Sequence, residues 1–111
     1  MQREIKKYLF DIQSCIENIE TFIGAPPIFT TFEYNMMLQQ AVERNLEIIG
    51  EAVNNLLKTY PEIKITDARR MVDTRNKIIH SYDGIQPIQI WNIIINHLPI
   101  LKQEVQTLLE N

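Results

Sequence analysis

The segment from Arg75 to Tyr82 reads RNKIIHSY and brings together side chains that could cleave a phosphodiester bond. The forked guanidinium of Arg75 could hold a phosphate, and an ordinary histidine titrates near neutral pH, which suits His80 to proton transfer. Neither role requires a metal. The pattern Arg-x4-His-x-Tyr therefore indicates a candidate site for metal-independent phosphodiester chemistry.

The spacing within this segment limits how one chain can use it. If the segment is helical, Asn76 and His80 lie one turn apart on the same face. Arg75 and His80 are instead offset by roughly 140° around an ideal helix. Either the end of the helix unwinds or a second copy of the chain completes the site. Tyr82 follows near the end of the helix, where its hydroxyl can reach solvent or a partner.

A structural explanation of the same residues remains open on spacing alone. His80 could interact with the C-terminal end of its helix, Arg75 could form a surface ion pair, and Tyr82 could pack on the protein. The other histidine, His97, lies just before Pro99 in an apolar segment. We interpret His97 as a structural histidine whose ring is satisfied by hydrogen bonding.

The elements that must position the motif are predicted to be helices. Residues 2–23 carry apolar side chains at alternating steps of three and four, and Gly24, Pro26 and Pro27 end this helix. Thr30 or Thr31 is expected to cap a second helix over residues 32–59. The apolar positions of that helix are Leu38, Val42, Asn45, Ile49, Ala52 and Leu56, widened by Ala41, Ile48 and Val53.

Two more helices complete the prediction. Thr66 and Asp67 mark the start of a third helix that ends near His80, and Pro87 suits the first turn of a fourth. Pro99 should kink the fourth helix because it lacks a backbone N–H. The apolar stripe of this helix is Trp91, Ile94, Ile95, Leu98, Leu101, Val105 and Leu108. We predict an all-α, antiparallel four-helix bundle with a kinked last helix and one domain over residues 1–111.

Gly50 lies in the interior of the second predicted helix. Glycine there costs on the order of 1 kcal/mol relative to alanine. We therefore expect another backbone to approach closely at this point, beside Glu51.

Composition excludes several classes of protein. The residues are 45% hydrophobic and 23% charged, with a formal net charge of −3, which is unlike a protein that coats nucleic acid through bulk charge. Any RNA binding must come from a local basic patch, and Arg69, Arg70, Arg75 and Lys77 form a candidate. The charged N-terminal segment and the lack of a long apolar run favour a cytoplasmic location without membrane association.

Metal and cofactor motifs are absent from the sequence. Cys15 is the single cysteine, so it cannot form an internal disulfide. Glu43, Glu47 and Glu51 fall at successive helical turns, but no Glu-x-x-His motif accompanies them, and we interpret them as a solvated face. No glycine-rich phosphate loop occurs. We therefore expect neither a metal nor a cofactor.

Three segments together resemble the HepT-like toxins of the HEPN superfamily. They are VERNLEIIGEAVNNL at 42–56, RNKIIHSY at 75–82 and IWNIIINHLPIL at 90–101. The resemblance implies a helical homodimer whose Arg-His motifs meet at the interface in an RNA-cleaving cleft. Arg75 would bind the scissile phosphate, Asn76 would orient the site, and His80 would transfer protons as the ribose 2′-hydroxyl attacks.

The same resemblance implies a partner. HepT-like toxins of type VII-like toxin–antitoxin systems are neutralised by a minimal nucleotidyltransferase antitoxin, which transfers AMP to the tyrosine of the motif, here Tyr82. A bulky anion there would compete with RNA phosphate for Arg75 and His80. Glu51 would help to position the motif or the partner.

Two other functions fit the sequence. The chain could be a non-catalytic HEPN module that serves as partner or substrate-recognition subunit of a nucleotidyltransferase. It could also be a structural dimerisation bundle with a degenerate site, as the broad apolar face of the second helix suggests.

Overall fold

The computed structural model describes residues 2–81 and 84–111, and these residues form helices with no strand among them. In chain order the helices are α1 (Arg3–Ile23), α2 (Phe29–Glu33), α3 (Met36–Thr59), α4 (Ala68–His80), α5 (Pro87–Asn96) and α6 (Leu98–Glu110). Within this described part of the chain, no helix combines the length and the apolar character needed to cross a membrane.

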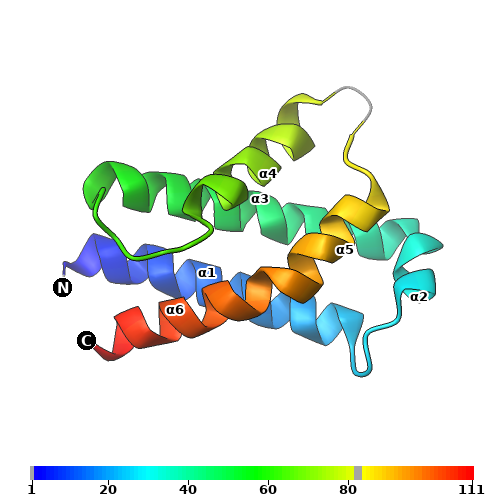
Figure 1. The fold of residues 1–111 in the computed structure, drawn as a ribbon, viewed down its shortest axis with the longest axis horizontal. Helices are drawn as coiled ribbons and strands as arrows, with labels where there is room; N and C mark the ends of the chain where they lie inside the picture. Colours follow the sequence, from blue (N-terminus) through cyan, green and yellow to red (C-terminus); the bar gives the residue numbers. More distant parts are fainter. Residues whose placement is uncertain (1, 82–83) are drawn as a thin grey trace.

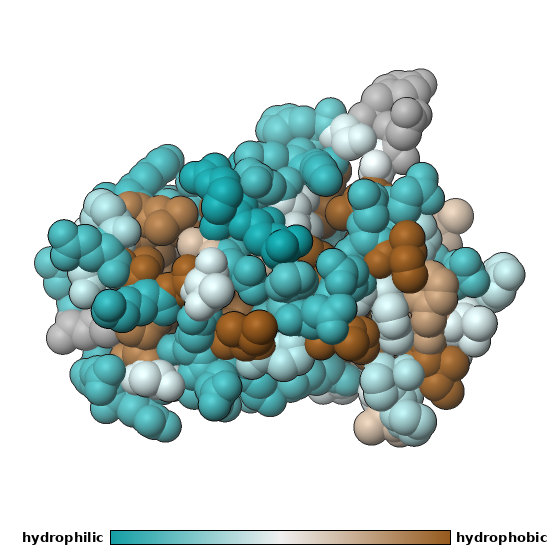
Figure 2. Space-filling model, viewed as in Figure 1, coloured by the Kyte–Doolittle hydropathy of each residue, from teal (hydrophilic) through white to brown (hydrophobic). Residues whose placement is uncertain are grey.

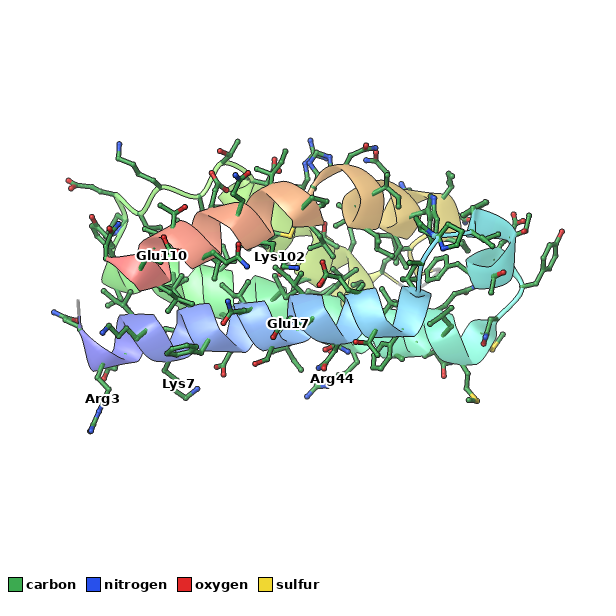
Figure 3. The ribbon with its side chains drawn as sticks, turned by 90° about the horizontal axis from the view of Figure 1, so that it is seen from below. Arg3, Lys7, Glu17, Arg44, Lys102 and Glu110 are labelled. Carbon is green, nitrogen blue, oxygen red and sulfur yellow. The ribbon has the colours of Figure 1, made fainter. Side chains whose placement is uncertain are left out.

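The long helices alternate in direction and pack as a bundle (Figure 1). α1 lies beside α3, α4 packs on α3, and α6 packs on α1. α5 and α6 together take the place of the fourth helix. Lys102 of α6 contacts both carboxylate oxygens of Glu20 in α1 at 3.0 Å, and Figure 3 shows Lys102 between these helices. The predicted all-α four-helix architecture is confirmed.

The start of the second long helix differs from the prediction. Phe29–Glu33 forms the separate short helix α2, and α3 begins at Met36. Its N-cap is Asn35, whose side-chain oxygen accepts a hydrogen bond from the backbone N–H of Leu38 at 3.0 Å. The expectation that Thr30 or Thr31 caps this helix was wrong, because the asparagine oxygen satisfies a free N–H of the first turn.

The last helix is interrupted as Pro99 predicts. The backbone of His97 leaves helical geometry, with φ of −120°, and separates α5 from α6. Pro99 has no N–H to donate to the carbonyl of Ile95, and its ring would clash with that carbonyl in a straight helix. The break changes which residues face the core. Ile95, expected to be buried, is 38% exposed, whereas Ile90 and Ile93 are buried.

One cluster of buried apolar side chains joins the helices. Several residues of the predicted stripes are fully buried: Leu9, Ile12, Val42, Ile49, Leu56, Leu101 and Val105. Asn45 is the polar member of the α3 seam. Its amide donates to the Ala41 carbonyl at 2.8 Å and accepts from Asn18 at 3.1 Å. The buried amide is therefore satisfied, and it ties α3 to α1.

Candidate functional site

The motif helix α4 lies unusually close to α3 at Gly50. A methyl group at position 50 would overlap Cβ of Arg75 and would lie 2.7 Å from the carbonyl oxygen of Met71. Only hydrogen fits at this crossing, which explains why glycine stands in the interior of a helix. The close backbone approach expected from the sequence is confirmed, and it occurs at the first residue of the motif.

The guanidinium of Arg75 is held by two neighbours. Its Nη2 atom lies 3.0 Å from Oε2 of Glu51 in α3, and its Nη1 atom donates to Oδ1 of Asn76 at 3.0 Å. The Nε atom is buried without a partner among the described residues. The Arg75 side chain is 27% exposed. Each terminal nitrogen has a second N–H that can donate a hydrogen bond to an anion. Three of the predicted site residues, Arg75, Asn76 and Glu51, are therefore in direct contact in the structure.

His80 is the last residue of α4, and its side chain is exposed. It forms no side-chain hydrogen bond with any residue in the described ranges. α4 remains helical through His80. Around the helix axis, His80 is therefore offset by roughly 140° from Arg75 but by only about 40° from Asn76. One chain therefore does not place Arg75 and His80 on the same face. Tyr82 lies outside the described residues.

Two hollows flank α4. The first, which we call the α4–α5 groove, has a volume of about 910 Å³ and opens between these two helices. Its polar lining comprises Arg69, Arg70, Asp73, Thr74, Asn76, Lys77, Gln89 and Asn92. Figure 2 shows hydrophilic atoms gathered over α4 on this face, beside hydrophobic atoms over α5. The predicted basic patch therefore lines this groove, except for Arg75.

The second hollow, which we call the Arg75 hollow, has a volume of about 390 Å³ and lies among α1, α3 and α4. Each of its cations is paired with a carboxylate. The pairs are Lys7 with Asp11 at 3.0 Å, Arg44 with Glu47 at 3.1 Å and Arg75 with Glu51 at 3.0 Å. Figure 3 shows Lys7 and Arg44 projecting on one side of the bundle. The hollow is consequently close to electrically neutral.

The three glutamates of α3 have separate environments. Glu47 and Glu51 form the ion pairs above, whereas burial and the nearby charge of Glu47 raise the pKa of Glu43 above its ordinary value. No three His, Cys, Asp or Glu side chains in the described residues are grouped closely enough to hold a metal ion.

His97 has a structural contact, as the sequence indicated. Its Nδ1 atom lies 3.0 Å from Oδ2 of Asp67, and the two side chains are 18% and 14% exposed. Asp67 also lies 3.5 Å from Nε of Arg70. This contact joins the break between α5 and α6 to the start of α4. Sequence reasoning assigned Asp67 only to the start of the helix and did not anticipate this role.

Gln89 and Asn92 were also missed as lining residues of the α4–α5 groove. Their spacing of three residues places both on one face of α5. That spacing was the available signal, but the sequence could not show that α4 lies opposite.

Known proteins resemble this chain along nearly all of its length. The model of a family described as "Ribonuclease HepT-like" matches residues 12–108. The chain is 38% identical over 112 residues to a Thermococcus cleftensis protein named "Probable ribonuclease HepT", covering 97% of this chain and 98% of that protein. It is 34% identical over 109 residues to a Methanocaldococcus jannaschii protein provisionally named an RNase, with 95% and 96% covered. No solved structure matches the chain.

Proposed function

Because the chain belongs to the HepT-like ribonuclease family, we propose that it is a metal-independent RNA endonuclease with Arg75 and His80 as its catalytic residues. The observation that carries this proposal is the fixed guanidinium of Arg75 on the same helix as the exposed ring of His80. Asn76 and Glu51 are the supporting residues, because they hold that guanidinium in place.

The chemistry follows from the groups available. The ribose 2′-oxygen attacks phosphorus and gives its proton to the neutral ring of a His80, while Arg75 donates hydrogen bonds to the phosphate oxygens as charge develops there. The bond to the 5′-oxygen breaks, and that oxygen takes a proton from water while His80 returns its proton to solvent. The products are a 2′,3′-cyclic phosphate and a 5′-hydroxyl. DNA lacks the attacking hydroxyl and is spared.

The active unit in this proposal is a homodimer with composite sites. The angular offset between Arg75 and His80 supports it, because two copies facing each other could bring Arg75 of one and His80 of the other to one phosphate. A dimer formed from an Arg75→Ala chain and a His80→Ala chain then retains one intact composite site. Mixing the two inactive variants should restore measurable cleavage. If each site lay within one chain, the mixture would remain inactive.

The direct test measures cleavage of single-stranded RNA in the presence of a metal chelator. His80→Ala should lower the rate by about 100-fold or more, as expected for loss of a general acid or base. His97→Gln is the matched control, since it replaces the chain's other histidine at a structural position. Cleavage that His80→Ala leaves unchanged would refute the catalytic assignment.

Biologically, the protein would act as the toxin of a type VII-like toxin–antitoxin system. Its partner would be a minimal nucleotidyltransferase that transfers AMP to Tyr82. The test is the intact mass after incubation with ATP and any minimal nucleotidyltransferase that is encoded beside this chain. Tyr82→Phe should gain no mass, whereas Tyr34→Phe, which alters a tyrosine that is 85% exposed, should be modified like the wild type. An unmodified wild type would refute this step.

A non-catalytic partner of a nucleotidyltransferase is the second candidate function. The ion pair between Arg75 and Glu51 favours it, because a guanidinium already paired with a carboxylate attracts phosphate less strongly. Toxicity of the expressed protein discriminates between the two functions. Growth arrest that disappears in both Arg75→Ala and His80→Ala would support the ribonuclease and exclude this alternative.

A further inference from the structure

The α4–α5 groove is positively charged although the whole chain is negative. Arg69, Arg70 and Lys77 line it, with Asp73 as the one carboxylate among the described residues, whereas the chain carries a net charge of −3. Arg69 lies 3.7 Å from Asp73, and Arg70 lies 3.5 Å from Asp67. The Arg69–Asp73 pair is exposed and contributes little, so an incoming phosphate can replace Asp73 there, whereas Asp67 beside Arg70 is only 14% exposed. Lys77 forms no ion pair within the described ranges.

Three amides give the groove a further common property. The side-chain oxygen of each amide already accepts a hydrogen bond. Asn76 accepts from Nη1 of Arg75 at 3.0 Å, and Gln89 accepts from the backbone N–H of Gln86 at 3.0 Å. Asn92 accepts from the side-chain amide of Asn96 at 2.7 Å. The NH₂ groups of these amides remain as donors. Together with the cations, they make the polar lining rich in donors and poor in acceptors. Such a lining is complementary to a ligand rich in acceptors, as the phosphate and sugar backbone of a nucleic acid is.

The groove leads towards His80. On an ideal helix His80 lies about 40° from Asn76 and about 60° from Lys77, so it continues the groove face beyond its last cation. Arg70 and Lys77 are separated by roughly 10 Å along α4. At about 3.4 Å per phosphate along a stacked strand, this length accommodates about three phosphates.

The apolar wall of the groove favours an unpaired strand. Ile85, Ile88 and Ile93 line the side opposite α4, and Ile88 is 57% exposed. The faces of unpaired bases can lie against such side chains, whereas a duplex keeps its base faces stacked inside. The Arg75 hollow is less suited to binding an RNA strand, because each of its three cations is paired with a carboxylate.

We propose that the α4–α5 groove binds single-stranded RNA and guides it to His80, with Arg69, Arg70 and Lys77 contacting phosphates and the three amides contacting sugar or base acceptors. This inference rests on the proposed ribonuclease function and specifies where its substrate lies outside the catalytic residues.

The test compares two double variants in a His80→Ala background, which prevents cleavage during binding. Arg69→Gln with Lys77→Gln alters the groove, and Lys6→Gln with Lys58→Gln alters exposed lysines on α1 and α3. Each pair removes two positive charges and changes the net charge from −3 to −5. Fluorescence anisotropy of a labelled single-stranded RNA of about 12 nucleotides, within usual site sizes, measures binding over a range of salt concentrations.

The groove variant should bind about tenfold more weakly than the parent, and its slope of log K against log salt should fall by about 1.4, or 0.7 for each lost phosphate contact. The control pair should change binding less than twofold. A duplex of the same sequence should compete poorly. Equal binding by the two double variants would overturn the groove assignment, and so would displacement of the RNA by poly-glutamate at matched charge, which would indicate an acidic protein ligand.

Cleavage by the wild-type chain separates this inference from the proposed function. If the wild type cleaves RNA and the groove variant binds normally, the groove assignment is wrong while the ribonuclease function stands. If binding depends on the groove but the wild type does not cleave, the groove assignment stands and the nuclease assignment is wrong. If RNA is neither bound nor cleaved, both are wrong.

Discussion

Arg75 of α4 and Glu51 of α3 form an ion pair in which Nη2 and Oε2 are 3.0 Å apart. The Glu51 side chain is 51% exposed, so solvent screens the pair and it contributes about 1 kcal/mol or less to stability. Its main effect is on orientation. The carboxylate holds the guanidinium on the α3 side of α4, where Asn76 holds the other terminal nitrogen.

Removing this carboxylate should impair cleavage more than stability. Glu51→Ala is expected to lower kcat/KM by about tenfold, because the freed guanidinium loses its orientation. Glu51→Gln should retain more activity, since the amide can still accept a hydrogen bond. Glu47→Ala is the matched control, because it breaks the neighbouring pair with Arg44 and leaves Arg75 paired. Equal losses of activity in both alanine variants would contradict a specific role for Glu51.

Gly50→Ala tests the close crossing of α3 and α4. The added methyl group meets Cβ of Arg75 and the Met71 carbonyl, so α4 must move. We expect the free energy of unfolding to fall by about 1–3 kcal/mol, although alanine favours helix formation. Chemical denaturation measures this change, and RNA cleavage per folded molecule should also fall. Lys58→Ala, an exposed change in the same helix, should stay within about 0.5 kcal/mol of wild type. A more stable Gly50→Ala protein would show that the helices can separate without cost.

His97→Ala should destabilise the protein without changing its chemistry. The half-buried carboxylate of Asp67 loses its contact with the His97 ring, and we expect the free energy of unfolding to fall by about 1–3 kcal/mol. Thermal unfolding measures the loss. Cleavage per folded molecule should remain near the wild-type value at a temperature well below Tm. A large drop in kcat with unchanged Tm would mean that His97 belongs to the catalytic machinery.

Glu43→Gln should make the protein more stable at neutral pH. Burial and the charge of Glu47 raise the pKa of Glu43 in the folded chain, so the folded state binds this proton more tightly than the unfolded state. The free energy of unfolding therefore falls as pH rises through the folded pKa. Glutamine removes that loss, by an expected gain of about 0.5 kcal/mol or less at pH 7.

The gain from Glu43→Gln should disappear near pH 3, below the ordinary pKa of glutamate, where the wild-type carboxyl is protonated in both states. Tm measured from about pH 3 to pH 8 provides the comparison. Glu62→Gln, at an exposed position, serves as the control for loss of one negative charge. A stability difference that is constant over this range would contradict the assignment to Glu43.

Local signals in the sequence were sufficient for much of the fold. The apolar period of α1 and α3 identified most of the buried positions within these two helices, Gly24 with Pro26 and Pro27 marked the end of α1, and Pro99 marked the interruption of the last helix. These signals act over a few residues, through side-chain period and backbone sterics. The start of α3 was less predictable, because the expected caps Thr30 and Thr31 lie inside α2 and the cap at the observed boundary is Asn35.

The sequence by itself determined an all-α chain, a motif with the side chains for phosphodiester chemistry, and a glycine that requires a close neighbour. Tertiary structure alone decided that this neighbour is Arg75, that Glu51 holds its guanidinium, and that Asp67 meets His97. It also placed α4 across from α5, so that Arg69 and Lys77 line the same groove as Gln89 and Asn92. The physical reason is separation along the chain: helical periodicity fixes which residues share a face, but only packing in space determines what that face meets.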